Sequence, residues 1–148
     1  MQTLRPFVCG TDFSEGADQA LQFTLKLAIA ARTRIALVHV CELDVEMVDE
    51  LRLLRCHEAL NALVEQNRHR GIDVTGVLRS GRPWEKVDNV ATDLGASLIV
   101  IGRRGAGTRN VSLGSVADQL LRTASRPVLT VTNGFNRLDV EVSETKCK

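Results

Sequence analysis

Aromatic residues are scarce in this chain. It has no tyrosine, one tryptophan and four phenylalanines, which together make up 3% of the residues. Such a composition argues against a nucleic-acid surface built on base stacking and against a protein interface rich in aromatic anchors. The formal net charge is only +1, so there is no broad basic field for nucleic acid or anionic lipid. We therefore expect neither nucleic acid nor a membrane as a partner.

Long apolar runs are lacking as well. No run approaches the ~18 residues that a membrane-spanning helix requires. Residues 1–6 do not show the charged region, apolar stretch and small-residue cleavage site of a signal peptide. From these two absences we expect a cytoplasmic protein.

The four cysteines include no Cys-x-x-Cys pair, which disfavours a zinc knuckle and a thioredoxin-like redox pair. Cys9 and Cys41 fall in or at the end of strand-like runs, and we expect them to be buried small hydrophobic residues. Cys56 precedes His57, but a polar helix surface explains this pair, so we predict no metal site there. Cys147 lies in a polar tail, where an oxidant can reach it.

Three common fingerprints of nucleotide binding and catalysis are missing. The P-loop pattern Gly-x-x-x-x-Gly-Lys-Ser/Thr does not occur, and Gly-x-Gly-x-x-Gly does not follow the first strand-like run. No serine occurs in a Gly-x-Ser-x-Gly context, and no Ser–His–Asp set is indicated. The sequence therefore predicts no dedicated catalytic constellation.

What the sequence does contain is a regular alternation of strand-like and helix-like segments. Apolar runs predict five strands, and apolar residues at helical spacing predict four helices between them. The strands are expected at residues 7–10, 34–40, 72–79, 97–101 and 128–132, and the helices at about 15–32, 44–70, 83–94 and 115–124. Along the second helix the expected apolar stripe consists of Val45, Val48, Leu51, Ala59, Leu60, Leu63 and Val64. The near-continuous apolar run at 34–40 indicates a strand buried on both faces, as in a parallel sheet.

This alternation predicts an α/β fold, a doubly wound parallel sheet of five strands with helices on both faces. We expect one domain over residues 1–135, followed by a polar tail at 136–148. The tail contains Val140 and Val142 in alternation and is expected to be either a short extra strand or disordered.

A candidate binding site lies after the first and fourth strands. Parallel sheets bind ligands at the carboxyl ends of strands where the strand order reverses, which in the order 3-2-1-4-5 is between these two strands. The first strand ends in Gly10–Asp12, and the fourth ends in the glycine- and arginine-containing loop Gly102–Gly105. Gly114-Ser115 then precedes a helix, whose free N–H groups favour an anion. The loops predict a phosphate cradle; the alternative is a generic strand-to-helix connection with a glycine turn.

These segments, in this order, resemble the universal stress protein family. The resemblance covers about residues 4–132, and its motifs lie at Val8–Ser14, Leu37–Val40, Ala96–Gly105, Leu113–Ala117 and Arg126–Val131. It implies a doubly wound α/β domain that dimerises through its last strand, here Val128, Leu129, Thr130, Val131 and Thr132. This apolar strand is otherwise expected to be an exposed sheet edge.

ATP-binding members of the family carry Gly-x-x-Gly, a gap of about nine residues and then Gly-Ser/Thr. The resemblance implies ATP as the ligand, with Mg²⁺ as a candidate companion, and a site formed by Thr11, Asp12, Val40, Gly102, Gly105, Gly114, Ser115 and Val116. The two converging loops add Gly10 and Arg103 to this candidate site. Gly102 would lie near the ribose, and Thr11, Asp12 and Val40 on the adenine side. The phosphates would meet the other positions of the motif, Gly105, Gly114, Ser115 and Val116.

The loop carries three arginines, Arg103, Arg104 and Arg109, which either offset triphosphate charge or form a solvated basic surface. The sequence also departs from the family pattern at two points. The gap from 106 to 113 holds eight residues, one fewer than the pattern, and Gly10 stands where such proteins often have proline.

Three functions follow as alternatives. The first is a dimeric stress-response or signalling module that binds ATP and has at most weak ATP hydrolysis. The second is a dimeric stress protein that does not bind ATP and acts through protein–protein interaction, which the shortened gap favours. The third is an enzyme of adenylyl transfer, which the missing catalytic residues disfavour.

Overall fold

The computed structural model describes residues 5–42, 50–68, 71–105 and 113–132. Strands and helices alternate along this part of the chain, as the apolar pattern predicts. In chain order the elements are β1 (Phe7–Gly10), α1 (Glu15–Ala31), β2 (Ile35–Cys41), α2 (Glu50–Arg68), β3 (Val74–Ser80), α3 (Pro83–Leu94), β4 (Leu98–Gly102), α4 (Ser115–Thr123) and β5 (Val128–Val131).

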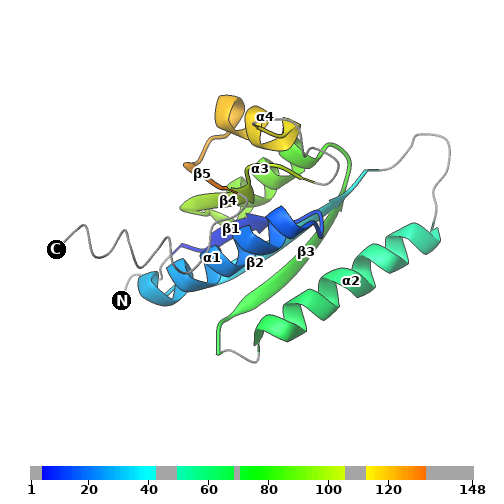
Figure 1. Ribbon diagram of the computed structural model, residues 1–148, viewed down its shortest axis with the longest axis horizontal. Helices are drawn as coiled ribbons and strands as arrows, with labels where there is room; N and C mark the ends of the chain where they lie inside the picture. The colour runs from blue at the N-terminus through cyan, green and yellow to red at the C-terminus, as the bar shows by residue number, and fades with distance from the viewer. Residues whose placement is uncertain (1–4, 43–49, 69–70, 106–112, 133–148) are drawn as a thin grey trace.

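The five strands form one parallel sheet in the order β3-β2-β1-β4-β5, which confirms the predicted fold class and strand order (Figure 1). β1 is central, because Val8 pairs with Ala36 of β2 on one side and with Ile99 of β4 on the other. The strand order reverses between β1 and β4. Parallel strands end at the same edge of a sheet, so the loops after β1 and β4 emerge side by side.

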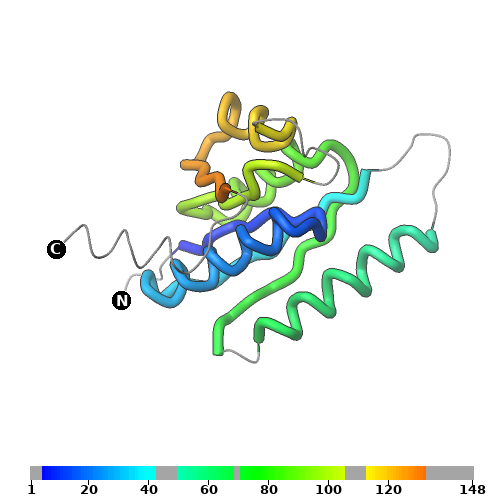
Figure 2. Tube along the Cα trace, in the orientation of Figure 1, coloured from blue at the N-terminus to red at the C-terminus, as the bar shows by residue number. Residues whose placement is uncertain are grey.

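Helices cover both faces of the sheet (Figures 1 and 2). On one face, α1 and α2 pack over a core that contains Cys9, Leu21 and Leu37. On the other face, α3 and α4 pack over a core that contains Val8, Ile99 and Leu120. Successive residues of β1, such as Val8 and Cys9, therefore enter opposite cores, and both are fully buried. A strand covered on both faces requires the continuous apolar run that the sequence shows.

Local signals in the sequence set the helix ends. Ser14 caps α1, because its side chain accepts a hydrogen bond from Ala17 N at 3.2 Å. Pro83 occupies the first turn of α3, where its missing N–H costs nothing. Gly95 ends α3 with a φ of 63°, a backbone conformation that glycine adopts without strain.

α2 differs from the sequence-based expectation. Leu60 and Val64 are buried as expected, but Leu51 and Ala59, which were expected on the same apolar stripe, are exposed. All the buried residues of α2 belong to its second half, from Leu60 onward. The first half of the helix is therefore less buried than the second.

Some predicted features fall outside the described residues. They include the first turns expected for α2 at 44–49, the loop at 106–112, and the polar tail with its boundary after residue 135. Within the described residues, no helix combines the length and the apolar character needed to cross a membrane.

Candidate functional site

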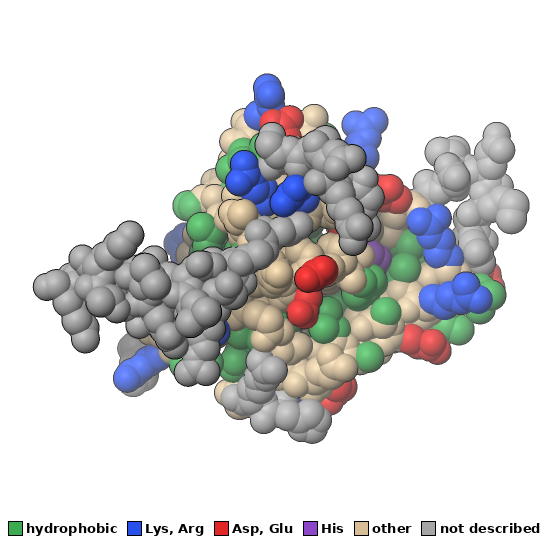
Figure 3. All heavy atoms as spheres, in the orientation of Figure 1, with side chains coloured by type: hydrophobic (Ala, Val, Ile, Leu, Met, Phe, Trp, Pro, Cys, Tyr) green, Lys and Arg blue, Asp and Glu red, His purple; other side chains and the backbone are tan. Residues whose placement is uncertain are grey.

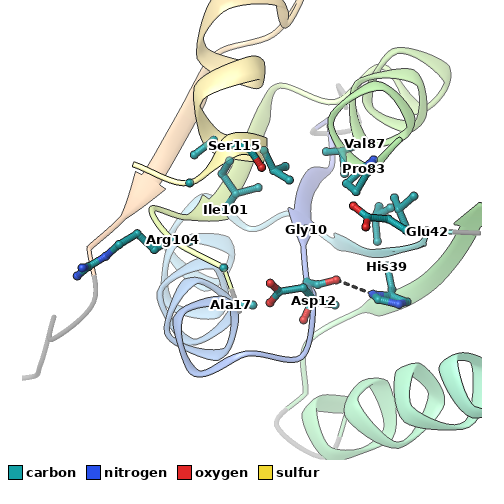
Figure 4. A pocket seen from close by; sticks show the side chains of 18 of the residues that line it. Gly10, Asp12, Ala17, His39, Glu42, Pro83, Val87, Ile101, Arg104 and Ser115 are labelled. Carbon is teal, nitrogen blue, oxygen red and sulfur yellow. Dashed lines mark hydrogen bonds between the residues drawn. The ribbon is translucent and has the colours of Figure 1, made fainter. Parts of the chain in front are cut away.

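A cavity of about 370 Å³ opens at the carboxyl ends of β1, β2 and β4. Its size falls in the range of small-molecule sites in proteins. The structure brings all ten residues predicted from the sequence to its wall: Gly10, Thr11, Asp12, Val40, Gly102, Arg103, Gly105, Gly114, Ser115 and Val116. In Figure 4, Ser115 and Asp12 lie on different sides of the cavity, and Gly10 lies between them.

The loop after β1 is built by hydrogen bonds around Thr11, which is buried. Its backbone N–H donates to Val38 O of β2 at 2.8 Å, and its side-chain oxygen accepts from Phe13 N at 3.0 Å. Its carbonyl oxygen accepts a 2.8 Å hydrogen bond from His39 Nδ1 (Figure 4). A carbonyl can only accept, so His39 carries its proton on Nδ1 in this arrangement. These bonds fix the loop against β2.

Asp12 extends from this loop toward the loop after β4. Its Oδ1 accepts a hydrogen bond from Ser14 N at 3.0 Å, which holds the carboxylate in place. Its Oδ2 lies so close to Gly105 that a Cβ added to Gly105 would come within 2.5 Å of it. The two loops therefore meet where a carboxylate approaches a glycine, and no larger residue fits at position 105 unless Asp12 moves.

The glycines after β4 allow close approaches of backbone. A Cβ on Gly102 would lie 2.9 Å from both the carbonyl carbon and oxygen of Gly16, so the end of β4 packs directly on the start of α1. Gly114 N donates to Arg103 O at 2.8 Å, and Arg103 N donates to Val131 O at 2.8 Å. The loop after β4, the start of α4 and the end of β5 are thus joined to one another.

The shortened gap does not separate the two parts of the glycine motif. Residues 106–112, which make up most of the gap, lie outside the described residues, and so does Arg109. The residues that flank the gap are close together, because a Cβ on Gly114 would lie 3.5 Å from Gly105 N. With eight residues in the gap, the chain still brings Gly105 beside Gly114 and Ser115.

The N-terminus of α4 opens into the cavity. Gly114 is its N-cap residue, and no side chain caps it. Ser115, Val116 and Ala117, the first three residues of the helix, all line the cavity. Backbone N–H groups in the first turn of a helix have no partner within the helix and favour negative charge. This end of the cavity therefore suits an anion.

Charged side chains of both signs surround the cavity. Arg52, Arg103 and Arg104 contribute positive charge, and Asp12 and Glu42 contribute negative charge. In Figure 4 the side chain of Arg104 points away from the cavity. Figure 3 shows basic side chains beside α4 and on one end of α2, with acidic side chains between them. Because charges of both signs line the cavity, the side chains alone do not mark it as an anion site, whereas the start of α4 has the backbone groups for one.

Sequence reasoning missed a second part of the wall. Cys41 and Glu42 follow Val40 at the end of β2, while Arg52 and Cys56 come from α2. The Sγ atoms of Cys41 and Cys56 are 3.4 Å apart. Only the apolar run that ends at Val40 indicated this side of the cavity, because the weak stripe of α2 did not fix which of its faces meets β2.

Comparison with known proteins identifies the fold and its relatives. The universal stress protein MJ0577 of Methanocaldococcus jannaschii is 26% identical over 146 residues, covering 82% of this chain and 90% of its own. The universal stress protein YxiE of Bacillus subtilis is 28% identical over 138 residues, covering 81% and 93%. A solved structure of the universal stress protein from Archaeoglobus fulgidus, in complex with dAMP, is 25% identical with a TM-score of 0.71, covering 87% and 98%.

The match extends over almost the whole described fold. A sequence model of the universal stress protein family aligns with residues 3–132, from before β1 to the end of β5. The doubly wound parallel sheet is the fold that the sequence resemblance implies. This chain belongs to the universal stress protein family.

Proposed function

We propose that the cavity binds an adenine nucleotide, with ATP as the physiological ligand. In this proposal the chain acts as a dimeric stress-response or signalling module with at most weak ATP hydrolysis. The observation that carries the proposal is the meeting of three segments around one cavity: Gly10–Asp12, Gly102–Gly105 and the uncapped start of α4. Phosphate groups bind well where glycine-rich backbone and a helix N-terminus come together.

The residues present fit such a ligand. Gly105 and Gly114 lie close together at the start of α4, and the Ser115 hydroxyl adds a hydrogen-bonding group there. At the other end, Val38, Val40 and Val87 supply an apolar wall of the kind that a base requires. The solved relative from Archaeoglobus fulgidus, which is in complex with dAMP, supports adenine as the base.

Gly114→Asp tests the phosphate end. The φ of −71° at Gly114 suits any residue, and an added Cβ would make only ordinary contacts of 3.4 Å or more. Aspartate is also a favoured N-cap residue, so the variant is expected to fold. Its carboxylate would repel the phosphates, and we expect the affinity for Mg-ATP in isothermal titration to fall about 100-fold.

Gly114→Asn is the matched control, because it has the same shape and capping ability without the charge. It is expected to lose much less affinity than Gly114→Asp. Equal losses in both variants would contradict binding of phosphate at this helix. If the unaltered protein releases no nucleotide on denaturation and gives no heat with Mg-ATP, the proposal fails. A dimeric stress protein that acts through protein–protein interaction without ATP is then the better-supported function.

The dimer is proposed from the edge position of β5. Val128, Leu129 and Thr130 are only partly buried there, although the strand is apolar. Ile99 N donates to Pro127 O and Arg103 N to Val131 O, so the strand alternation turns the backbone groups of Val128 and Thr130 away from β4. Among the described strands β5 has no neighbour on this side, and in the proposed dimer a second copy of β5 pairs with these groups.

Thr130→Pro removes one outward N–H and leaves the bonds to β4 in place. Thr130→Val is the control, because it keeps the N–H and the β-branched shape. We expect the proline variant to shift toward monomer in sedimentation at micromolar concentration and the valine variant to stay dimeric. A concentration-independent monomer for the unaltered chain would contradict the dimer.

A further inference from the structure

Two thiols lie in contact at the wall of the cavity away from the glycine loops. Cys41 is the last residue of β2, and Cys56 lies in α2. Their Sγ atoms are 3.4 Å apart, against about 2.05 Å in a disulfide. Both line the cavity, with Cys41 buried and Cys56 partly exposed. A small oxidant in the cavity can therefore reach Cys56, and Cys41 already stands beside it.

The position of Cys56 in the first half of α2 gives its contact with Cys41 a mechanical role. Every buried residue of α2 lies at Leu60 or beyond, and Leu51 and Leu54 in the first half are about half exposed. Figure 2 shows α2 alongside the edge strand β3, where only one side of the helix meets the sheet. A covalent bond at Cys56 would fasten the loosely held half of α2 to the end of β2.

The surroundings decide which thiol reacts first. Burial and the contact with Cys41 raise the pKa of Cys56, while the positive charge of Arg52, one helical turn earlier, lowers it. Glu42 adds a negative charge on the β2 side of the cavity. Cys9 is fully buried, and burial raises the pKa of its thiol to about 12, so it is the least reactive of the three. Of the two thiols in contact, Cys41 is buried and Cys56 is partly exposed to the cavity, which makes Cys56 the site of attack.

We propose that Cys41 and Cys56 form a reversible disulfide that fastens the first half of α2 to β2 and narrows this end of the cavity. The oxidant is a peroxide. The Cys56 thiolate attacks one peroxide oxygen, giving a sulfenic acid and releasing hydroxide. The Cys41 thiol, deprotonated as it reacts, attacks the Cys56 sulfur, and the sulfenic oxygen leaves as water. A small dithiol reductant restores both thiols by exchange.

The pair is better suited to oxidation than to metal binding. Among the described residues, no cluster of three or more His, Cys, Asp and Glu side chains is arranged to hold an ion. His57, the neighbour of Cys56, has its Nδ1 3.3 Å from Asn61 Nδ2. Two thiols in contact, without further ligands of this kind, are the arrangement that sulfenic acid condensation requires.

The first test detects the disulfide in the 148-residue chain carrying Cys147→Ser, a substitution that removes bridges between molecules through that residue. After treatment with hydrogen peroxide, the intact mass should fall by two hydrogen atoms, and digestion should yield a linked peptide containing Cys41 and Cys56. Dithiothreitol should reverse both changes. Cys56→Ser should abolish the mass loss, and Cys9→Ala should not.

The second test measures what the bond does. Hydrogen exchange in residues 50–59 should slow on oxidation in the Cys147→Ser protein and stay unchanged in its Cys56→Ser derivative. The narrowed cavity, a consequence that rests on the proposed function, should bind Mg-ATP about tenfold more weakly.

Two outcomes would overturn the proposal. Cys56 that accumulates as sulfinic acid while Cys41 stays a free thiol would show that the bond does not form. A mapped bond with unchanged exchange in residues 50–59 would show that it fastens nothing. If the reduced protein binds no nucleotide, the proposed function fails, whereas peptide mapping and hydrogen exchange still decide the disulfide.

Discussion

The end of the cavity at α4 and the end at α2 differ in what forms their walls. At α4, the wall consists of backbone held by backbone: Gly114 N bonds to Arg103 O, and Gly102 packs on Gly16. At α2, the wall consists of side chains, among them the thiols of Cys41 and Cys56. A backbone wall recognises charge whatever the side chains are, whereas a wall of side chains can be altered by chemistry.

The two ends also differ in how firmly they are held. α4 begins within a set of hydrogen bonds that joins the ends of β4 and β5. The first half of α2 contributes no fully buried residue. Segments with few buried contacts open most easily in a folded protein. We therefore expect the end of the cavity at α4 to be stable, and the stability of the end at α2 to depend on whether its two thiols are reduced or oxidised.

Oxidation should remove much of this difference, and it is the largest effect that we expect. The bond would close a loop between residues 15 positions apart, which stabilises a chain by about 3 kcal/mol through the unfolded state. Urea unfolding of peroxide-treated protein, with and without dithiothreitol, would measure it. The gain should be absent in Cys56→Ser; a gain that persists there would assign it to another modification.

Gly102→Ala should destabilise the fold at the end of the cavity near α4. The added methyl would lie 2.9 Å from the backbone of Gly16 and force β4 away from α1. Overpacking of this kind costs about 1–3 kcal/mol in the free energy of unfolding. Gly114→Ala is the control in the same site, because its methyl would make only ordinary contacts, and it should cost under about 1 kcal/mol. Similar losses in thermal unfolding would contradict the close packing of Gly102.

Arg52→Gln should give the smallest effect, on the rate of oxidation at the α2 end. The charge of Arg52 lowers the pKa of Cys56, so its loss should raise that pKa and slow the reaction with peroxide about twofold to fivefold at neutral pH. In the unaltered protein the pKa of Cys56 is raised, so the rate should climb with pH above neutrality as thiolate forms. Stopped-flow measurements of the oxidation rate would test both expectations. Arg55→Gln, on the same helix, is the control and should change this rate little.

Most of the fold could be predicted from the sequence because its signals are local and repeated. Ser14, Pro83 and Gly95 mark helix ends, and the run at 34–40 indicates a strand covered on both faces. The glycine loops could also be located, because parallel strands bring their carboxyl ends together. The observed strand ends differ from the predicted ones by a residue or two. At Cys41, for example, β2 runs one residue further, because Gly81 N donates to the Cys41 carbonyl and extends the pairing of β2 with β3.

The contact between Cys41 and Cys56 could not be predicted, for a physical reason. Apolar residues occur on several sides of α2, so its pattern does not fix which side is buried. Leu51 and Ala59 belong to the predicted apolar stripe, but both are exposed. The rotation of such a helix about its axis is set by its contacts with β2 and β3, not by its own pattern. Which residues of α2 reach the cavity is therefore a property of the assembled fold.

The adjacency of β1 and β4 has a consequence for folding and ligand assays. Val8 pairs with Ile99 across some ninety residues of chain, so the cavity forms only after both halves of the sheet have joined. A ligand that contacts both loops binds the folded chain and not the unfolded one, so it stabilises the whole domain by mass action. At 100 times its dissociation constant that gain is about 2.7 kcal/mol. A shift in unfolding temperature would therefore reveal any small molecule that the cavity accepts, whatever its chemistry.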